Sequence, residues 1–310
     1  MTISVIVPTK NRPHDLALAM QSLVAQTRLP DEIIVVDQSE DGGSELSVKA
    51  LLDAAALKGV RPELRYVRDP AIVGANAARN VGMRMAKSEI VALIEDDIVL
   101  ERFALERLLQ AYERYPELLG MSGAITNYGP PSRAFRLFDR IFTLGAFTDD
   151  RQPLYWGCDD YGADEVVPIT QMGGLMTWRA SAIVDLAFDE TPKALRVRGE
   201  DRDFCFMTSG RAGRGRRVFG MAMGARLAHN PSPVGRFRGR LEELKAVSQH
   251  WFYRRHLSRS PVHTLLYAWW NVGLVLSAVA AALRGRSLEP VRALGRGWRH
   301  IARGYLRSAT

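Results

Sequence analysis

Three consecutive acids, Glu95, Asp96 and Asp97, interrupt an apolar run in the segment VALIEDDIVL (91–100). Carboxylates are rarely buried without a partner, so acids that end a core strand need a ligand or a counter-charge. Because alternate side chains of a strand share a face, we expect Glu95 and Asp97 to point one way and Asp96 the other. Such an acid pair suits Mg²⁺ or Mn²⁺, which take oxygen ligands from one or two carboxylates and from substrate phosphates.

Two other apolar runs also end in polar residues. The loop TKNRP (9–13) follows the first run, and Asp37 ends the run EIIVVD (32–37). In a parallel sheet these residues meet at the carboxyl edge, where ligands bind in folds of this kind. A solvated turn explains any one of them, but three such strand ends favour a binding edge.

Short apolar runs alternate with amphipathic stretches through the first 126 residues. The runs predict strands at 3–8, 32–37, 64–69, 89–96 and 120–126. The amphipathic stretches predict helices at 13–26, 44–59, 74–86 and 103–116. This alternation predicts an α/β fold with a Rossmann-like mixed, mainly parallel sheet flanked by helices.

The middle of the chain is less regular. We expect substrate-facing loops at 127–170, then a strand end, a Gly pair and a helix start at 171–183. The stretch 198–213 predicts a short helix that begins with acids and ends at Gly.

Length and composition limit the number of domains and indicate the cellular compartment. Its 310 residues, 47% of them hydrophobic, suffice for one large core or two domains. Cys158 and Cys205 form no CxxC pair, which favours a reducing cytosol. The N-terminal apolar run lacks a basic segment before it, so we expect no signal peptide.

The net charge of +8 is divided unevenly. Residues 1–210 hold 23 Lys and Arg against 31 Asp and Glu, whereas residues 211–310 hold 19 against 3. Such a basic block favours anionic partners, namely lipid headgroups, nucleic acid or phosphorylated substrates. No nucleic-acid-binding motif accompanies it, so we expect no nucleic acid partner.

The C-terminal region has the composition of a membrane-associating segment. TLLYAWWNVGLVLSAVAAAL (264–283) carries no charge and is long enough to span a bilayer. In 287–308, apolar residues and arginines occupy different faces of one predicted helix, typical of a helix that lies on an anionic membrane. We favour a peripheral or partly embedded region over a spanning one; a helix buried against the catalytic domain is the third alternative.

Five stretches occur in a fixed order over about residues 2–230: SVIVPTKNRPHDLALAMQSLVAQ, DEIIVVDQSEDG, GANAARNVGMRMAKSEIVALIEDD, GGLMTWRASAI and GEDRDF. Together they resemble the family 2 glycosyltransferases with the GT-A fold. The resemblance implies transfer of a hexose or deoxyhexose from a nucleotide-diphosphate sugar, with inversion and with Mn²⁺ or Mg²⁺ as cofactor. It also implies a bacterial cell-envelope or exopolysaccharide setting.

The resemblance assigns roles residue by residue. The implied nucleotide-sugar-binding residues are Pro8, Thr9, Asn11, Arg12, Asp37, Asn76, Arg79, Asn80, Glu95 and Asp96. Asp97 corresponds to the metal ligand, and Glu95 stands where the family usually has Asp. In GEDRDF, Asp201 corresponds to the general base and Glu200 is the second choice. Acids that complement a helix dipole are the alternative reading of that motif.

Later positions carry weaker assignments. His229, in ARLAHNP, corresponds to a late His that serves as a metal ligand or diphosphate contact; a surface His beside a turn is the alternative. Gly173, Gly174 and Trp178 correspond to the acceptor side. Packing at a helix start is the alternative for Trp178.

Other functions lack their motifs. A sugar-phosphate nucleotidyltransferase would carry a Gly-rich loop after the first strand, and a dinucleotide dehydrogenase would carry GxGxxG. A processive synthase would need several membrane helices and a QxxRW-type motif, which the sequence around Gln249 does not supply. A catalytically inactive nucleotide-sugar-binding membrane scaffold is the remaining alternative, and the retained Asp97 and Asp201 argue against it.

We therefore predict a metal-dependent, non-processive glycosyltransferase with a lipid-linked or saccharide acceptor, on the cytoplasmic face of the cell membrane. Its GT-A catalytic domain is expected at 1–235, with a nucleotide-sugar-binding half at 1–127 and an acceptor and catalytic half at 128–235. A basic helical membrane-associating region is expected at 236–310.

Overall fold

The computed structural model describes residues 1–57, 59, 62–190, 199–211, 217–231 and 241–304. The chain divides into two compact units by its internal contacts. The first comprises Met1–Gly129, Asp150–Phe188 and Phe204–Val234; the second comprises Pro130–Asp149, Asp189–Asp203 and Gly235–Thr310. The second unit thus takes in two segments, 130–149 and 189–203, that the sequence placed in the catalytic domain.

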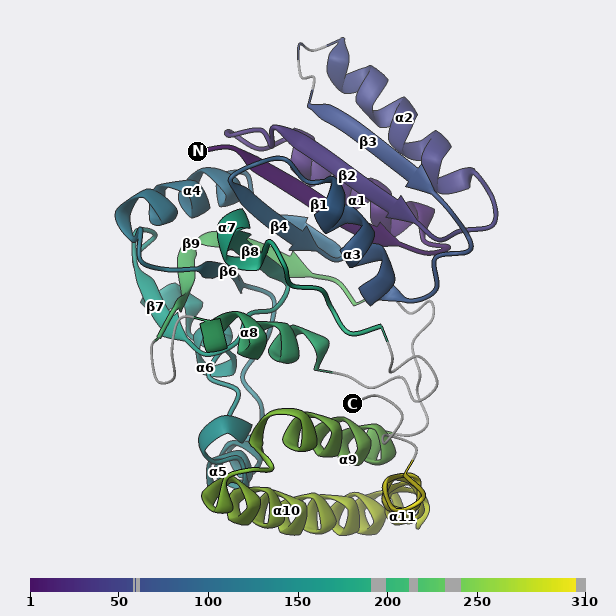
Figure 1. The fold of residues 1–310 in the computed structure, drawn as a ribbon, viewed down its shortest axis with the longest axis vertical. Coiled ribbons are helices and arrows are strands. Elements are labelled where there is room, and N and C mark those ends of the chain that lie inside the picture. The colour runs from purple at the N-terminus through teal and green to yellow at the C-terminus, as the bar shows by residue number, and fades with distance from the viewer. Residues whose placement is uncertain (58, 60–61, 191–198, 212–216, 232–240, 305–310) are drawn as a thin grey trace. The chain divides into compact units, whose positions relative to one another are not determined.

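The described residues of the first unit form a nine-stranded mixed sheet, in the order β3-β2-β1-β4-β8-β6-β9-β5 with β7 paired to β9 (Figure 1). Its strands are β1 (Ile3–Thr9), β2 (Glu32–Asp37), β3 (Glu63–Arg68), β4 (Ile90–Ile94), β5 (Ile98–Leu100), β6 (Gly120–Ile125), β7 (Val166–Ile169), β8 (Leu175–Arg179) and β9 (Phe219–His229). Strands β3, β2, β1 and β4 are parallel, and β8 is antiparallel to β4 and β6. The predicted mixed sheet is confirmed.

Helices flank this sheet. They are α1 (Pro13–Val24), α2 (Gly43–Ala56), α3 (Ala75–Met85), α4 (Ala104–Arg114), α6 (Gln152–Trp156), α7 (Ala180–Ile183) and most of α8 (Glu200–Arg211), with a 3₁₀ turn η2 (Cys158–Asp160). Strands β1, β2 and β4 are buried along their whole length, which explains their unbroken apolar sequences. The order in which the chain adds strands to the sheet reverses at β1, because β2 and β3 lie on one side of it and β4 on the other. A ligand is expected at such a switch point.

The structure differs from the sequence prediction in four places. In 171–183 the Gly pair comes before a strand, β8, whereas the prediction put a strand end before the Gly pair. The predicted strand 89–96 ends at Ile94, and the chain turns before it resumes as β5, so the three acids lie in a turn. The predicted loops at 127–170 include α5 (Arg133–Phe142), α6 and β7. The longest strand, β9, was not predicted, because the glycines and single Arg of FGMAMGARLAH blur its apolar pattern.

The second unit is helical over its described residues. It contains α5, a 3₁₀ turn η1 (Gly145–Phe147), the first residues of α8, then α9 (Leu241–Phe252), a π-helical turn η4 (Tyr253–Leu257), α10 (Pro261–Gly285) and α11 (Glu289–Ala302). Gly297 lets α11 approach α9 closely, since a Cβ there would lie 3.0 Å from the carbonyl oxygen of Glu243. The predicted apolar stretch 264–283 lies within α10. The predicted basic helix is α11, and its last residues, Tyr305 and Arg307, lie outside the described residues.

Candidate active site

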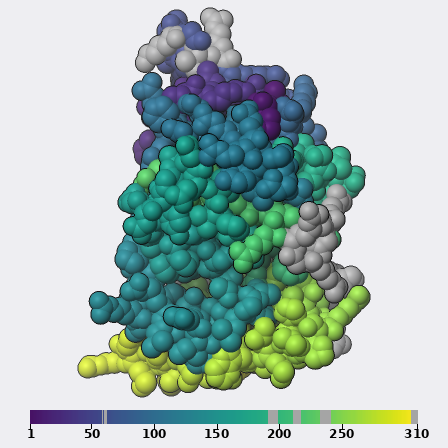
Figure 2. All heavy atoms as spheres, turned by 90° about the vertical axis from the view of Figure 1, so that its left-hand side faces the viewer, coloured from purple at the N-terminus to yellow at the C-terminus, as the bar shows by residue number. Residues whose placement is uncertain are grey.

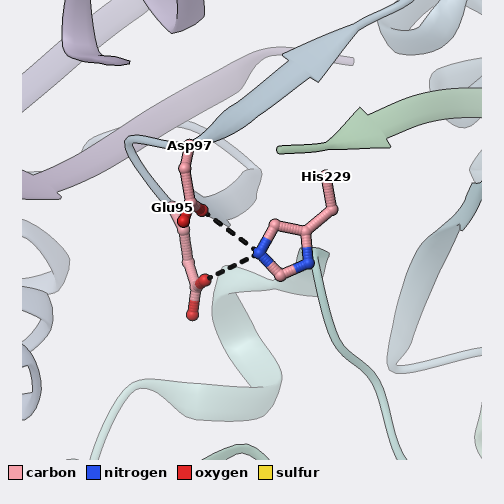
Figure 3. A group of neighbouring side chains, drawn as sticks. All are labelled: Glu95, Asp97 and His229. Atoms are coloured by element: carbon pink, nitrogen blue, oxygen red, sulfur yellow. Dashed lines mark ion pairs between the residues drawn. The ribbon is translucent and has the colours of Figure 1, made fainter. Parts of the chain in front are cut away.

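Glu95, Asp97 and His229 converge on one point of the first unit (Figure 3). His229 Nε2 lies 3.2 Å from Asp97 Oδ1 and 3.7 Å from Glu95 Oε2. Within the described residues this Nε2 is buried without a hydrogen-bond partner. One ligand atom from each residue lies within 4.8 Å of the others. Two carboxylates and an imidazole nitrogen form a donor set that fits Mn²⁺ or Mg²⁺.

Strand pairing brings His229 to the acids. The end of β9 pairs antiparallel with β5, and His229 stands opposite Ile98. The amide of Asn230 donates to the carbonyl oxygen of Asp97 at 2.9 Å. The sheet itself therefore joins two parts of the chain that are far apart in sequence.

Two residues that sequence analysis did not select hold His229 in place. Tyr128 Oη lies 2.5 Å from His229 Nδ1. The Asn127 side chain accepts from the backbone N–H of His229 and donates to its carbonyl oxygen. Both residues follow β6 at the same sheet edge as Asp37 and Asp97. That position is the signal that could have identified them.

Asp96 points away from the cluster and ties two loops together. Its carboxylate accepts from Thr9 Oγ1 at 2.7 Å and from Arg12 Nη1 at 2.8 Å. Burial raises the pKa of Asp96 to about 6, although the bonds from Thr9 and Arg12 act in the opposite direction. The opposite orientations expected for Asp96 and for Glu95 with Asp97 are present in the structure, although a turn and not a strand produces them.

Arg79 supplies a cation next to Glu95 of the cluster. This buried guanidinium lies 3.3 Å from Glu95 Oε1 and donates to Asn76 Oδ1 at 3.1 Å. Its carbon also lies 5.4 Å from the Phe188 ring centroid. Asn80 exchanges two hydrogen bonds with the backbone of Phe188, at 2.8 and 2.9 Å. Arg79 thus faces the acids, whereas Asn80 anchors a neighbouring segment.

Asp37 is fully buried at the end of β2. Its carboxylate accepts from the Ser39 amide at 2.9 Å and from Tyr66 Oη at 2.7 Å. The pKa of Tyr66 lies well above its usual value, mainly because the phenol is buried and also because it faces the Asp37 carboxylate. The phenol therefore keeps its proton and donates. Next to it, Gln38 Oε1 accepts from the Gly74 amide at 2.9 Å and so connects β2 to the start of α3.

The loop after β1 has a constrained backbone. Asn11 has a φ of 55°, in the left-handed region that Asn tolerates better than most residues. Its amide donates to Ser39 Oγ at 2.7 Å. Pro8 lies within β1, paired with Val36 of β2. These contacts set the path that carries Thr9 and Arg12 to Asp96.

The Glycosyl transferase family 2 model matches residues 4–160 of the sequence, half of the chain. The chain belongs to glycosyl transferase family 2. Hyaluronan synthase of Pasteurella multocida is 36% identical over 98 residues, which cover 31% of this glycosyltransferase and 9% of the synthase. The chain spans less than half the length of the first curated relatives that it matches.

Solved structures show the same fold. TarS of S. aureus (residues 1–349) in complex with UDP-GlcNAc has a TM-score of 0.53 and 16% identity, over 99% of this glycosyltransferase and 92% of that chain. The mannosyltransferase PcManGT of Pyrobaculum calidifontis, in complex with GDP-Man and Mn²⁺, has a TM-score of 0.51 and 18% identity. That match covers 99% of this chain and 82% of the mannosyltransferase. The predicted family and GT-A fold are confirmed.

Steric constraints explain why glycine occupies both positions of the pair predicted on the acceptor side. A Cβ at Gly173 would lie 2.3 Å from Arg151 Nη1. Gly174 has a φ of +72°, and a Cβ there would lie 3.3 Å from Ile125 Cδ1. Ser122 Oγ fixes the pair further through the carbonyl oxygen of Gly173, at 2.9 Å.

Trp178 lies in the core of the first unit with 0% of its surface exposed. Its ring meets Phe204 edge-on at 5.0 Å and Phe188 at 6.4 Å between centroids. Because the side chain is enclosed by core residues, it offers no surface to an acceptor in this structure. Trp178 lies within β8, so it packs in the core as a strand residue and not at a helix start.

Glu200 and Asp201 lie in the first turn of α8, in the second unit. Glu200 Oε2 accepts from the Gly199 amide at 3.0 Å. Acids in this position complement the positive end of the helix dipole. The role of Asp201 as base, with Glu200 as second choice, remains a prediction.

The same turn of α8 is held by an ion-pair network that sequence analysis missed. The buried Asp203 carboxylate lies 2.5 Å from His256 Nε2 and 3.0 Å from Arg255 Nε. Arg255 Nη1 also lies 2.5 Å from Asp189 Oδ2. Both basic residues come from the π-helical turn η4, where widened backbone geometry is often used at functional sites.

Proposed function

We propose that this glycosyltransferase transfers a sugar from a nucleotide-diphosphate sugar to an acceptor hydroxyl, with inversion and with a divalent cation. The convergence of Glu95, Asp97 and His229 is the observation that carries the proposal. Mn²⁺ or Mg²⁺ held by these residues would supply positive charge that stabilises the departing nucleoside diphosphate. Support comes from similar folds that hold UDP-GlcNAc in TarS and GDP-Man with Mn²⁺ in PcManGT.

The chain's own residues hold the donor. In this proposal Arg12 and Arg79 face the acid turn as fixed cations and balance part of its negative charge. Thr9 and Asp96 fix the loop that contacts the nucleotide, together with Pro8 and Asn11. The resemblance assigns base recognition to Asp37, whose carboxylate is fully buried in this structure and bonded to Ser39 and Tyr66.

Asp201 takes the proton from the acceptor hydroxyl as the oxygen attacks the anomeric carbon. The new carbon–oxygen bond forms on the face opposite the diphosphate, whose own bond to that carbon breaks with its electron pair. Proton removal by a positioned carboxylate contributes roughly 10²–10⁴-fold to such reactions. Inversion follows from this single displacement.

The acceptor in this proposal is a lipid-linked or saccharide hydroxyl at the cytoplasmic face of the cell membrane. The basic, apolar C-terminal region motivates the lipid-linked choice, because it keeps the enzyme where such acceptors lie. A cell-envelope or exopolysaccharide product follows from this choice.

A thermal-shift screen with UDP-, dTDP- and GDP-sugars, each with and without Mn²⁺ or Mg²⁺, tests the donor site. A ligand at a hundred times its Kd stabilises the folded state by about 2.7 kcal/mol, which raises Tm by several degrees. We expect one nucleotide class to raise Tm in a metal-dependent manner. Asp97→Ala should abolish this rise.

Asp201→Asn separates binding from chemistry. We expect it to keep the metal-dependent Tm rise while transfer to any accepted hydroxyl falls at least about 100-fold. If no donor raises Tm in folded wild-type protein, the donor-site proposal fails. If Glu200→Gln abolishes transfer and Asp201→Asn does not, the base is Glu200.

A further inference from the structure

Helix α10 exposes a row of large apolar side chains along its length. The α10 row consists of Val262, Leu265, Trp269, Val272, Leu276, Val279 and Leu283, each at least 41% exposed. These residues recur at steps of three and four, so they share one helical face. A helix of this span extends about 32 Å. Scattered exposed apolar residues are ordinary, but a continuous face of this length indicates a binding surface.

The opposite face of α10 is packed within the second unit. Its buried residues are Trp270, Gly273, Leu274, Ala278 and Ala282. Gly273 allows α5 to come close, since a Cβ there would lie 2.5 Å from Phe142 Cβ. Figure 1 shows α5, α9 and α11 beside α10, and contacts join α10 to all three. Among the described residues, the row holds the large apolar side chains of α10 that remain exposed.

The row continues onto α5. Trp269 Nε1 donates to the carbonyl oxygen of Ile141 at 2.7 Å, and its ring stacks on Phe142 with centroids 5.1 Å apart. Ile141 and Leu137 are themselves exposed. In the space-filling view the residues of α5 adjoin the yellow-green C-terminal helices (Figure 2). The apolar surface therefore covers two neighbouring helices.

Helix α10 is long and apolar enough to cross a bilayer, by length and composition. Its neighbours are not. Helix α9 carries Glu242, Glu243 and Lys245, and α5 carries Arg136 and Arg140. If α10 crossed the bilayer with its present packing, these charged helices would enter hydrocarbon at a cost of several kcal/mol. An orientation parallel to the bilayer immerses the row and leaves the charges in water.

Exposed arginines occur on the same helices, α5, α10 and α11. They are Arg133, Arg136 and Arg140 of α5, Arg284 and Arg286 at the end of α10, and Arg292, Arg299 and Arg303 in and after α11. Within the described chain none of these eight forms an ion pair. The acids Glu243 and Glu289 pair instead with Arg296, at 3.0 and 2.6 Å. These helices thus carry exposed arginines that no acid of the described residues neutralises.

We propose that the α10 row, with Leu137 and Ile141 of α5, seats this enzyme on an anionic lipid bilayer, with α10 in the plane of the interface. Apolar side chains would enter the headgroup boundary while the arginines meet anionic headgroups. A second copy of the chain carries the same positive charge and would be repelled. This inference rests on the membrane location given in the proposed function and assigns it to particular residues and one orientation; it does not depend on the transfer reaction.

Vesicle flotation of the full chain tests the surface. We expect binding to vesicles that contain phosphatidylglycerol and little binding to pure phosphatidylcholine. Leu265→Glu with Leu276→Glu should weaken that binding by at least about tenfold. The matched control is Leu46→Glu with Leu57→Glu, which changes two leucines of the first unit that are 71% and 91% exposed. It should bind as wild type does.

A charge variant and a depth measurement complete the test. Arg133→Gln with Arg136→Gln and Arg140→Gln should weaken binding to the anionic vesicles without affecting the fold. Fluorophores on Leu265→Cys, Val272→Cys and Val279→Cys, quenched by brominated lipids, should report one shallow depth; the native Cys158 and Cys205 are buried.

Four results would overturn the inference. They are no binding to anionic vesicles, equal binding by the row variant and wild type, a depth that changes steadily from Leu265 to Val279, and a wild-type dimer that the row variant dissociates.

Discussion

The imidazole of His229 lies between two partners, and each constrains its protonation. A cation at Nε2 needs the lone pair of that nitrogen, so the ring proton must lie on Nδ1. Nδ1 then donates to Tyr128 Oη, 2.5 Å away, and Tyr128 acts as acceptor. Partners of this kind fix the tautomer and the ring orientation of metal-binding histidines. Tyr128 is therefore expected to matter for cation affinity without touching the cation.

Replacing Tyr128 tests this expectation. Tyr128→Phe should lower Mn²⁺ affinity by about tenfold or more, because loss of such an outer partner typically costs 10–100-fold. Titration of free Mn²⁺ by electron paramagnetic resonance measures the change directly. Tyr115→Phe is the control, since Tyr115 lies at the end of α4, away from the cluster. Equal affinity in wild type and Tyr128→Phe would show that Asn127 and the strand pairing alone position His229.

At the scale of elements, Gly82 sets how closely α3 packs on β1. A Cβ at this position would lie 2.3 Å from Ile6 Cγ2. Helix α3 begins with the segment that carries Asn76 and Arg79, so its distance from β1 also sets where those side chains lie. In an exposed helix interior Gly→Ala stabilises by about 1 kcal/mol. Here the clash should reverse the sign.

We predict that Gly82→Ala lowers the free energy of unfolding by about 1–3 kcal/mol, the usual cost of an overpacked core. Denaturant unfolding gives the value. Gly210→Ala in α8 is the matched control, because no atom of the described residues lies within 4 Å of a Cβ there, and it should be neutral or stabilising. Ile6→Ala is itself destabilising, but in that background Gly82→Ala should cost less than it does in wild type. An equal cost in both backgrounds would place the strain elsewhere.

The turn η4 fixes the first turn of α8 through buried charge. Removing one partner of a buried ion pair leaves the other uncompensated, which costs about 3–5 kcal/mol. Asp203→Asn should therefore destabilise the second unit by about 3 kcal/mol, measured by denaturant unfolding. Asp164→Asn breaks an exposed pair with Arg107 and should change stability by less than about 1 kcal/mol. A similar effect of both variants would mean that solvent screens the Asp203 pair.

Local sequence patterns were sufficient for the parallel half of the sheet. Strands β1 to β4 and helices α1 to α4 follow from apolar runs and helical periodicity, with ends that differ by a few residues. Strands β5 and β9 pair across Ile98 and His229, and no local signal reports such a distant pairing. Helix α5 was missed although Phe135, Phe138 and Phe142 recur at helical spacing, because the surrounding stretch 127–170 is irregular and rich in aromatics and acids.

The candidate site shows the same division. The spacing of Glu95 and Asp97 predicted their common orientation, and the resemblance pointed to His229. Neither indicated Tyr128 or Asp203, because their significance arises only from contacts with His229 and His256. Trp178 is the opposite case: the motif selected it as a site residue, but its side chain is enclosed in the core.

At the scale of the whole molecule, acidic and basic charge are separated along the chain. Residues 211–310 carry 19 Lys and Arg against 3 acids. Arg296 pairs with Glu243 of α9 and Glu289 of α11. Within the described residues, Arg284, Arg286, Arg292, Arg299 and Arg303 are exposed and form no ion pair. Such a surplus favours an anionic surface at long range, whereas the α10 row acts only on contact. The two contributions should therefore separate in salt.

Vesicle binding at different ionic strengths measures that separation. The screening length is about 10 Å at 0.1 M salt and about 3 Å at 1 M, so salt should remove the arginine contribution and spare the apolar one. Between about 0.05 M and about 0.5 M NaCl, we expect wild-type affinity for phosphatidylglycerol vesicles to fall roughly tenfold but not to vanish. Leu265→Glu with Leu276→Glu should lose binding at the higher concentration. If affinity does not depend on salt, the arginines do not contribute to binding. If wild-type binding is lost completely at the higher salt concentration, the row does not contribute.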